Sequence, residues 1–238
     1  MADITTILFD LDGTLLPMDQ DAFIGAYFSR LAAKLMAHGY DKDKVGRAIW
    51  AGTGAMIQND GRCTNEQAFW NSFCAFFGQD ARGEEEYLIE FYRNEFQRVR
   101  EVCGYAPEAA GIVRDLKARG YRVVLATNPL FPALATESRI CWAGLEPCDF
   151  DMVTTFENSR YCKPNLAYYE DILTTLGVSG GECIMVGNDV DEDMITEQLG
   201  MKTFLLTDCL INKKGEDISK WPHGSFAELR EFLKTTAP

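Results

Sequence analysis

Two aspartates stand one residue apart in the segment DLDGT, residues 10–14, which directly follows the apolar run 6–9. Carboxylates this close repel each other, and the repulsion raises the pKa of one of them unless a cation lies between them. The sequence therefore predicts a site for a cation at Asp10 and Asp12. A plain turn is the alternative, because Asp-Gly is a common loop dipeptide and either aspartate could cap the segment that follows.

Thr127 and Asn128 follow a second apolar run, residues 122–126. A hydroxyl after a strand, together with the next backbone N–H groups, can hold a phosphoryl oxygen, although Ser or Thr in this place is usually only a cap. Lys163 stands just before Pro164, which is well placed to start a helix. This lysine would supply a local cation to a phosphorylated substrate, or it would be an ordinary solvent-exposed side chain.

The most acidic segment of the chain, residues 187–193, places four carboxylates within five positions after the apolar run 183–186. Such a density of negative charge is unfavourable without a divalent cation, and hard oxygen ligands of this kind select Mg²⁺. The alternative is a charged surface loop. That interpretation would be stronger if the run before the loop, residues 183–186, were less apolar.

These segments adjoin short apolar or β-branched runs, bounded by Gly, Asp, Asn or Pro, that are typical of buried strands. The predicted strands are residues 6–9, 122–126, 152–156, 183–186 and 203–206. Apolar residues at helical spacing separate the later runs, most plainly in residues 107–120 and 165–177. Strands that alternate with helices pair in parallel, so the sequence predicts an α/β fold with a doubly wound parallel sheet.

Residues 17–105 break this alternation, because they hold several amphipathic helical patterns and no convincing strand. We therefore expect an α/β core domain of residues 1–16 and 106–238, with an all-helical domain of residues 17–105 inserted over the end of the first strand. Thr64 and Gln67 have the spacing of a capping box, and residues 84–99 predict a further helix. The segment AGTGA, residues 51–55, is either a loop that contacts substrate or a turn between helices.

The charge and the cysteines exclude several classes of function. Acidic side chains number 36 against 23 basic ones, a net charge of −13, which argues against a general binder of nucleic acid or of anionic membranes. No run approaches the roughly 18 apolar residues of a membrane span, and we expect a cytoplasmic protein. The eight cysteines are scattered, which favours reduced thiols in a reducing compartment. His38 and His223 stand alone, the second in a loop with Pro and Gly, and this disfavours catalytic triads.

Taken in order, the four polar segments resemble the motifs of the haloacid dehalogenase (HAD) superfamily of phosphatases and phosphotransferases. The resemblance covers residues 4–16 and 107–210, and the helical insert has the position of that family's C1-type cap. It implies a Rossmann-like core, Mg²⁺ as cofactor, and a small phosphorylated metabolite as substrate. One departure lies in the last motif, residues 187–193, where Asn188 stands in the place at which the family usually has the first aspartate of that motif.

The resemblance also implies residue roles. Asp10 would be the nucleophile that forms an aspartyl-phosphate, and Asp12 the general acid and base. Thr127, Asn128 and Lys163 would bind the phosphoryl group. Mg²⁺ would be held by Asp10, by the backbone carbonyl of Asp12 and by Asp189. Asn188 and Asp193 are less secure candidates for the metal site.

Alternatives remain open from the sequence alone. The retained Asp12 favours phosphoryl transfer over dehalogenation, for which the resemblance leads us to expect a non-acidic residue. A phosphomutase of the β-phosphoglucomutase type would use the same motifs. A phospho-accepting or ligand-binding module without turnover is the alternative that is not an enzyme. The sequence is silent on the substrate, on the oligomeric state and on which residues of the insert contact the substrate.

Overall fold

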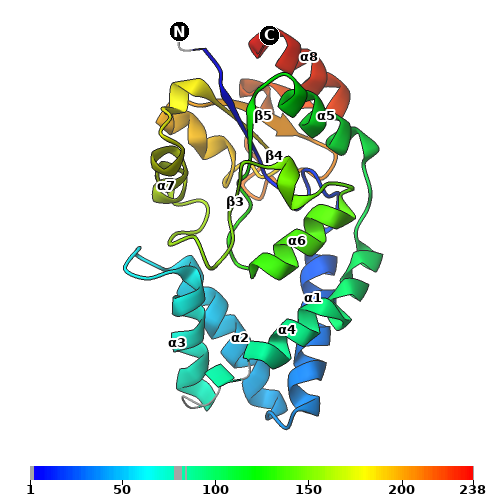
Figure 1. The fold of residues 1–238 in the computed structure, drawn as a ribbon, viewed down its shortest axis with the longest axis vertical. Helices are drawn as coiled ribbons and strands as arrows, with labels where there is room; N and C mark the ends of the chain where they lie inside the picture. Colours follow the sequence, from blue (N-terminus) through cyan, green and yellow to red (C-terminus); the bar gives the residue numbers. More distant parts are fainter. Residues whose placement is uncertain (1–2, 78–81, 84, 238) are drawn as a thin grey trace.

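A six-stranded parallel sheet forms the centre of the molecule (Figure 1), with the strand order β3-β2-β1-β4-β5-β6. The computed structural model describes residues 3–77, 82–83 and 85–237. The strands are β1 (Thr6–Phe9), β2 (Arg122–Leu125), β3 (Met152–Val153), β4 (Cys183–Gly187), β5 (Lys202–Leu206) and β6 (His223–Gly224). The α/β class and the parallel sheet predicted from the sequence are thereby confirmed.

The central strand β1 sets the register of the sheet. Phe9 lies opposite Leu125 of β2 and Val186 of β4. All three strands therefore end at one edge, and the polar residues that follow them meet there.

The five predicted strands all exist, but two details differ. The expected strand 152–156 stops at Val153, and the polar residues Thr154 and Thr155 after it are buried. The loop predicted around His223 is instead the short edge strand β6, which pairs with Leu205 and Leu206.

Helices cover both faces of the sheet. Ile7 and Phe9 of β1 pack in the same cluster as α5 (Pro107–Ala118) and α8 (Phe226–Thr236), whereas Leu8 packs with α7 (Leu166–Leu176) on the other face. This alternation confirms the doubly wound arrangement. The remaining helical elements of this part are α6 (Ala133–Trp142), η3 (Pro147–Asp149), η4 (Gly180–Glu182), η5 (Met194–Leu199) and η6 (Ile218–Lys220).

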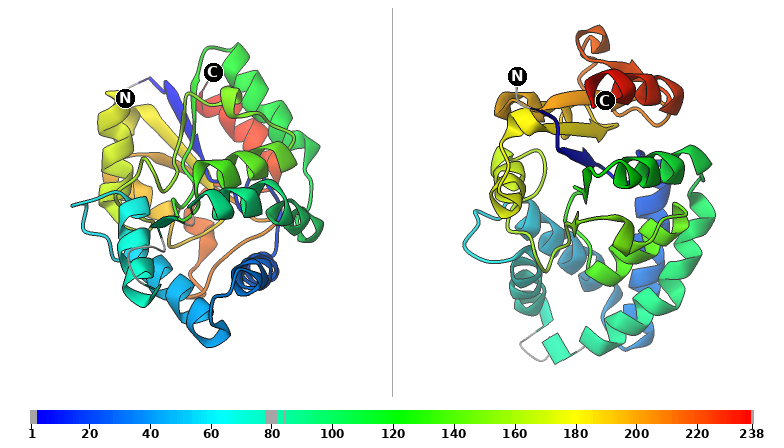
Figure 2. Two further views of the ribbon diagram at one scale, coloured as in Figure 1. Left: turned by 60° about the horizontal axis from the view of Figure 1, so that its bottom comes forward. Right: turned by 45° about the horizontal axis from the view of Figure 1, so that its top comes forward.

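Between β1 and α5 the described residues form helices, which lie together at the carboxyl edge of the sheet (Figures 1 and 2). They are α1 (Gln20–Ala37), α2 (Lys42–Ile57), α3 (Asn65–Phe77), α4 (Glu85–Arg93) and the 3₁₀ helix η2 (Glu95–Val102). The capping box is present, because Gln67 N donates to Thr64 Oγ1 and Thr64 N donates to Gln67 Oε1. The helix expected over residues 84–99 is divided into α4 and η2 at Asn94.

The expected loop or turn at residues 51–55 is wrong, since this segment lies inside α2. Gly52 lets α3 approach closely: a Cβ built on Gly52 would lie 2.5 Å from Cδ2 of Phe69. The glycine thus serves packing between two helices rather than a flexible loop. Within the described part of the chain, no helix combines the length and the hydropathy that crossing a membrane requires.

Candidate active site

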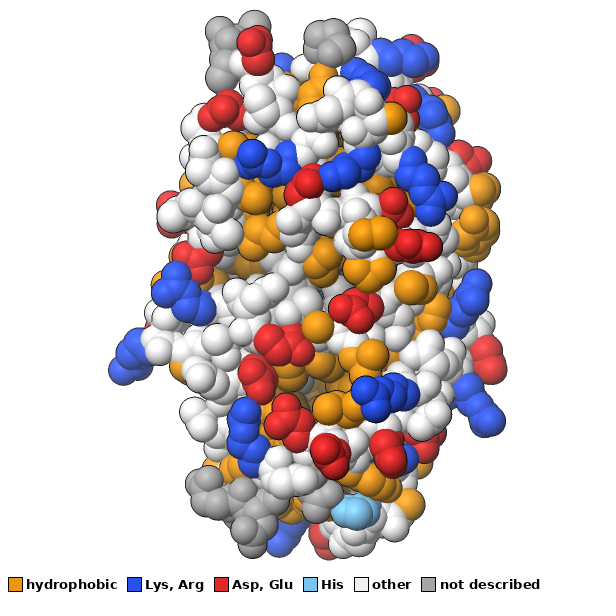
Figure 3. Space-filling view, viewed as in Figure 1, with side chains coloured by type: hydrophobic (Ala, Val, Ile, Leu, Met, Phe, Trp, Pro, Cys, Tyr) orange, Lys and Arg blue, Asp and Glu red, His pale blue; other side chains and the backbone are white. Residues whose placement is uncertain are grey.

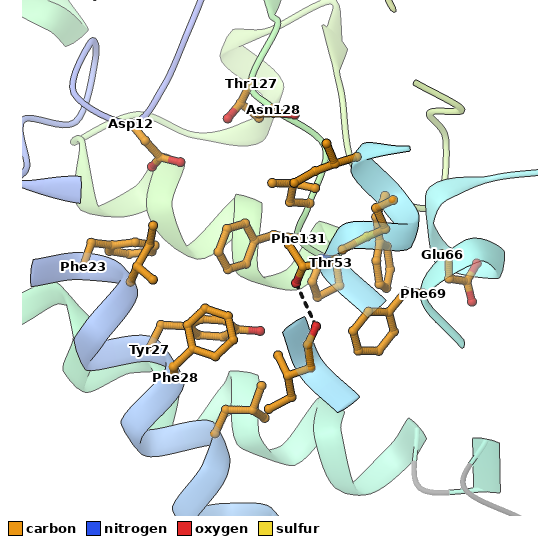
Figure 4. Close-up of a pocket in the computed structure, with 18 of the residues that line it drawn as sticks. Asp12, Phe23, Tyr27, Phe28, Thr53, Glu66, Phe69, Thr127, Asn128 and Phe131 are labelled. Atoms are coloured by element: carbon orange, nitrogen blue, oxygen red, sulfur yellow. Dashed lines mark hydrogen bonds between the residues drawn. The ribbon is translucent and has the colours of Figure 1, made fainter. Parts of the chain in front are cut away.

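A cavity of about 790 Å³ lies between the carboxyl edge of the sheet and the helices α1 to α4. The site residues predicted from the sequence all border it, although they come from four separate segments of the chain. They are Asp10, Asp12, Thr127, Asn128, Lys163, Asn188, Asp189 and Asp193. Figure 4 shows Asp12, Thr127 and Asn128 together at one end of the cavity, with aromatic rings beyond them.

Both carboxylate oxygens of Asp10 are held by neighbouring side chains. Oδ1 accepts a hydrogen bond from Lys163 Nζ at 2.9 Å, and Oδ2 accepts one from Thr14 Oγ1 at 3.1 Å. Only 7 % of Asp10 is exposed, so the carboxylate has little water around it and a fixed orientation. These are properties of a positioned nucleophile.

Lys163 is a buried cation shared by two carboxylates. Besides Asp10, its Nζ donates to Oδ1 of Asp193 at 2.7 Å. Burial favours the neutral amine, but the charges of Asp10 and Asp193 outweigh it and hold the pKa of Lys163 well above its ordinary value. The side chain therefore carries a fixed positive charge at the carboxyl edge of the sheet.

Asp12 is paired with a residue that the sequence reasoning missed. Arg139 of α6 is fully buried, and its guanidinium donates to Oδ2 of Asp12. Burial raises the pKa of Asp12 to about 6, with Arg139 opposing this and Asp10 adding to it. Among the described residues, the buried Oδ1 of Asp12 has no hydrogen-bond partner. Asp12 can therefore exist in both protonation states near neutral pH, with Oδ1 free for a ligand.

The acidic loop after β4 divides into residues with different contacts. Asp193 accepts from Lys163 and also from the backbone N–H of Asp189 at 3.0 Å, so both of its oxygens hold the site together. Asp189 Oδ1 accepts from the backbone N–H groups of Asp191 and Glu192. Asp193 therefore positions its neighbours. Asp189 borders the cavity, and among the described residues its Oδ2 has no hydrogen-bond partner.

Asn188 joins the acidic loop to the DLDGT segment. Its Oδ1 lies 2.9 Å from Thr14 Oγ1 and shares that hydroxyl's single proton with Asp10 Oδ2, and its Nδ2 donates to the carbonyl of Cys209 at 2.7 Å. Gly13 has a φ of +86°, and a Cβ there would lie 2.3 Å from Asn188 Nδ2. Gly13 is thus required both by its backbone conformation and by the approach of the asparagine.

Thr127 and Asn128 line the cavity at the end of β2. The backbone carbonyl of Thr127 accepts from the buried hydroxyls of Thr154 and Tyr168, at 2.8 and 2.9 Å, which fix this strand end. Asn128 Nδ2 donates to Glu192, at 3.2 Å to Oε2, and burial raises the pKa of Glu192 to about 7. Glu192, like Arg139, was not singled out from the sequence.

A signal for Arg139 exists in hindsight. It lies on the same face of α6 as Ala135, Thr136 and Ile140, all of which are buried. A charged residue on an apolar helical face needs a partner, but the helical pattern expected between residues 126 and 152 was given no bounds from the sequence.

The residues at the cavity fit a divalent cation only with help from the backbone. The carboxylates of Asp10 and Asp189 and the amide oxygen of Asn188 are hard oxygen donors of the kind that Mg²⁺ takes. Among the described residues, however, no three Asp, Glu, His or Cys side chains gather around one point. The fit therefore rests on two carboxylates completed by a backbone carbonyl and water, which is an ordinary ligand set for this ion.

The fold and the site define a class: parallel α/β enzymes that place an aspartate directly after the first strand and cover it with an inserted helical segment. A family model described as haloacid dehalogenase-like hydrolase matches residues 4–196. The chain belongs to this family.

A curated relative is similar over part of the chain. Glyceraldehyde 3-phosphate phosphatase of Methanothermobacter thermautotrophicus is 26 % identical over 134 residues, which are 56 % of this chain and 56 % of the relative. The chain thus matches about half the length of that curated relative.

Solved structures share the whole fold. A HAD phosphatase from Thermococcus onnurineus covers 97 % of this chain and 98 % of its own, with a TM-score of 0.58 and 23 % identity. A defluorinating L-2-haloacid dehalogenase covers 97 % and 95 %, also with a TM-score of 0.58, at 14 % identity. Since a phosphatase and a dehalogenase are equally similar in fold, the reaction must be argued from the site.

Proposed function

We propose that this hydrolase is a phosphatase that releases phosphate from a small phosphorylated metabolite through an aspartyl-phosphate on Asp10. The relative from M. thermautotrophicus, which is a phosphatase for a phosphorylated small molecule, supports the reaction class. The observation that carries the proposal is the second aspartate. Asp12 has a pKa raised to about 6 and a free oxygen beside the nucleophile, so it can donate a proton to a leaving oxygen.

In the first step, a carboxylate oxygen of Asp10 attacks phosphorus. The bond from phosphorus to Asp10 forms while the bond to the ester oxygen breaks, and that oxygen takes the proton from Asp12. Since Oδ2 of Asp12 accepts from Arg139, the proton to be transferred is held at Oδ1. The N–H groups of Lys163 and the hydroxyl of Thr127 bind the phosphoryl oxygens, whose charge they stabilise in the transition state.

In the second step, Asp12 acts as a base. It removes a proton from water while the water oxygen attacks phosphorus, the bond to Asp10 breaks, and phosphate leaves. Asp12 ends protonated and Asp10 ends as a carboxylate, so the enzyme returns to its starting state.

The cofactor in this proposal is Mg²⁺, held by the Asp10 carboxylate, the Asp12 backbone carbonyl and Asp189, with Asn188 as a further oxygen ligand. Neutralisation of charge between a carboxylate nucleophile and a phosphoryl dianion is the chemistry that the ion supplies when bound. Asp193 is proposed as a positioning residue instead of a ligand, because it is only 1 % exposed and accepts from Lys163 and from the backbone N–H of Asp189, and so orients both of these residues.

The helices of residues 17–105 are proposed to form a separate lid domain over a core of residues 1–16 and 106–238. Their position across the cavity supports this, since a lid there would exclude water and limit the substrate to small molecules. All eight cysteines are free thiols in this structure, which supports our placement of the protein in the reducing cytoplasm.

The test is hydrolysis of p-nitrophenyl phosphate by the purified protein, with Mg²⁺ and with excess chelator. We expect turnover that needs the ion and that Asp10→Asn abolishes. Asn keeps the size of the side chain, so the variant should still fold. Turnover of Asp10→Asn near the wild-type rate would refute the assignment of the nucleophile.

A panel of phosphorylated sugars, nucleotides and small acids, glyceraldehyde 3-phosphate included, then separates the reaction types. Free phosphate indicates a phosphatase, and an isomeric sugar phosphate would indicate a phosphomutase. A protein that binds these compounds without turning any over would be a binding module.

A further inference from the structure

Beyond the reacting aspartates, the cavity is lined by more aromatic side chains than the binding of a small polar metabolite would require. Ten aromatic side chains border it, and they come from α1 to α4 and from the segments that follow β2 and β3. Figure 4 shows Phe23, Tyr27 and Phe28 on one side and Phe69 on the other, with Phe131 between them, 5.0 Å from Tyr27 by ring centroids. An apolar enclosure of about 790 Å³ is large enough for a ligand well above the size of a triose.

Several of these side chains are not buried by the protein itself. Trp50 is 57 % exposed and stacks on the half-buried Phe28, with ring centroids 4.6 Å apart. Ile57, the last residue of α2, is 52 % exposed at the same cavity. Phe69 and Phe131 are also only partly buried. Large apolar side chains gathered around one opening favour burial by an apolar ligand.

The charges around the cavity disfavour a ligand that carries an anionic group in addition to its phosphate. Among the residues that the structure describes, nine carboxylate side chains border it, against three cations. Lys163 is buried, but it already neutralises Asp10 and Asp193. The other two cations, Arg93 and Lys213, are exposed, so neither offers a desolvated partner to an anion.

Four of these carboxylates lie outside the reacting centre: Glu66 on α3, Glu85 on α4, Glu137 on α6 and Glu157 after β3. Figure 3 shows acidic side chains around the orange hollow in the lower half of this face. Glu66 is paired with Arg82 at 3.0 Å, whereas Glu157 caps the start of α6 by accepting from Ala133 N at 2.9 Å. A carboxylate or a second phosphate on the substrate would therefore face more carboxylates than cations and meet net repulsion.

We infer that the substrate is the phosphomonoester of a large, hydrophobic, uncharged alcohol, with an aromatic ring or its equivalent in the cavity and no second anionic group. This inference rests on the proposed phosphatase function and narrows its substrate class. It sets the chain apart from enzymes for phosphorylated hydroxy acids and triose phosphates, whose leaving groups are small and polar.

The test compares three esters of primary alcohols, so that the leaving groups have similar basicity. They are ethyl phosphate, 2-naphthylmethyl phosphate and its 6-carboxy derivative. We expect kcat/KM for the naphthylmethyl ester to exceed that for ethyl phosphate by about 100-fold, because the ring buries apolar surface. The added carboxylate should lower kcat/KM by about 10-fold or more.

Thr53 offers a variant that changes the charge of the cavity without touching the reacting groups. It borders the cavity from α2, and its hydroxyl donates only to the carbonyl of Ile49 in its own helix, at 3.0 Å. Thr53→Lys should raise kcat/KM for the carboxylate ester relative to the neutral ester by about 10-fold. Thr53→Gln, the neutral control, should leave that ratio unchanged. Hydrolysis of p-nitrophenyl phosphate by each variant confirms that it is folded.

Binding of the alcohols alone separates this inference from the proposed function. Quenching of tryptophan fluorescence by 2-naphthylmethanol and by its 6-carboxy derivative measures occupancy of the cavity, because Trp50 borders it. If no ester is hydrolysed but the neutral alcohol binds selectively, the phosphatase proposal fails and the ligand preference stands. If p-nitrophenyl phosphate is hydrolysed but ethyl or carboxylate esters are preferred, the inference fails and the phosphatase proposal stands. If no ester is hydrolysed and neither alcohol binds, both the phosphatase proposal and the inference about the substrate are refuted. The exposed rings would then be buried by closure of the lid instead of by a ligand.

Discussion

The fully buried guanidinium of Arg139 forms an ion pair with the largely buried carboxylate of Asp12, 127 positions earlier in the chain. The same guanidinium lies 4.4 Å from the ring centroid of Phe131 and 3.2 Å from Thr136 Oγ1. Arg139 therefore joins the acid–base residue to the aromatic wall of the cavity. It touches no reacting atom in the proposed mechanism, so its role is to position Asp12.

Arg139→Met should destabilise the fold by about 3–5 kcal/mol, because it leaves the Asp12 carboxylate buried without its partner. The measurement is the free energy of unfolding in urea. The double variant Arg139→Met/Asp12→Asn removes both charges, and we expect it to be destabilised by less than the sum of the two single variants. Additive effects would mean that the two side chains do not act as a pair.

Asp12→Asn should lower kcat by roughly 100-fold or more for an alkyl phosphate, the usual contribution of a general acid and base. Hydrolysis of p-nitrophenyl phosphate should suffer less in its first step, because p-nitrophenolate leaves without a proton. A burst of p-nitrophenolate before slow turnover is the expected signature, since the second step still lacks its base. Equal losses with both substrates and no burst would contradict the assigned role.

Lys163→Met should lower kcat/KM by about 100- to 1000-fold, the effect of removing one donor to a charged transition state. It should also destabilise the fold, because Asp10 and Asp193 would remain buried with their shared cation removed. Lys214→Met is the matched control: its ion pair with Asp191 has a similar length, 2.7 Å, but the lysine side chain is 67 % exposed. We expect that variant to change the free energy of unfolding by less than about 1 kcal/mol.

Gly52→Ala should destabilise the fold by about 1–3 kcal/mol, since the added methyl group would overlap the ring of Phe69. Gly54→Ala, two residues on in the same helix, meets nothing nearer than 4.0 Å and should instead stabilise it by about 0.5–1 kcal/mol. Thermal unfolding of both variants checks this. If both substitutions raise the melting temperature, the close packing of α2 on α3 is wrong.

The fold should lose stability above pH 10 through Tyr27 and Tyr92, whose hydroxyls are hydrogen-bonded at 2.9 Å. Burial raises the pKa of Tyr27 from 10.0 to about 12, and it also raises that of Tyr92. Because the folded state favours the protonated form, the stabilisation is fully present below pH 10. It is lost as the pH rises toward 12, by up to about 1.4 kcal/mol per pH unit for each tyrosine.

The measurement is the free energy of unfolding between pH 9 and 11.5, for the wild type and for Tyr27→Phe/Tyr92→Phe. The double variant lacks both titrating groups, so its stability should fall less steeply with pH. Parallel curves for the two proteins would show that this pair does not titrate with unfolding.

Local patterns in the sequence were sufficient to predict those elements whose structure depends on residues close together in the chain. Helix α7 is an example: Asn165 caps its start by accepting from Ala167 N, and Gly177 ends it with a φ of +66°. The segment 51–55 shows the limit of such reasoning. Its two glycines favour a loop by propensity, but packing of α2 against α3 outweighs that preference.

The sequence by itself determined that Asp10, Thr127 and the acidic loop would meet, because residues that follow parallel strands share one edge of the sheet. Only the tertiary structure decided which partners these side chains have. Arg139 reaches Asp12, and Asp193 reaches Lys163, across elements whose approach depends on the packing of the whole core. The aromatic cavity is likewise assembled from helices and loops whose amphipathic patterns mark apolar faces without fixing what each face meets. The raised pKa of Asp12 also depends on the tertiary structure. It follows from burial of the carboxylate, which the folded chain produces and which no local motif predicts.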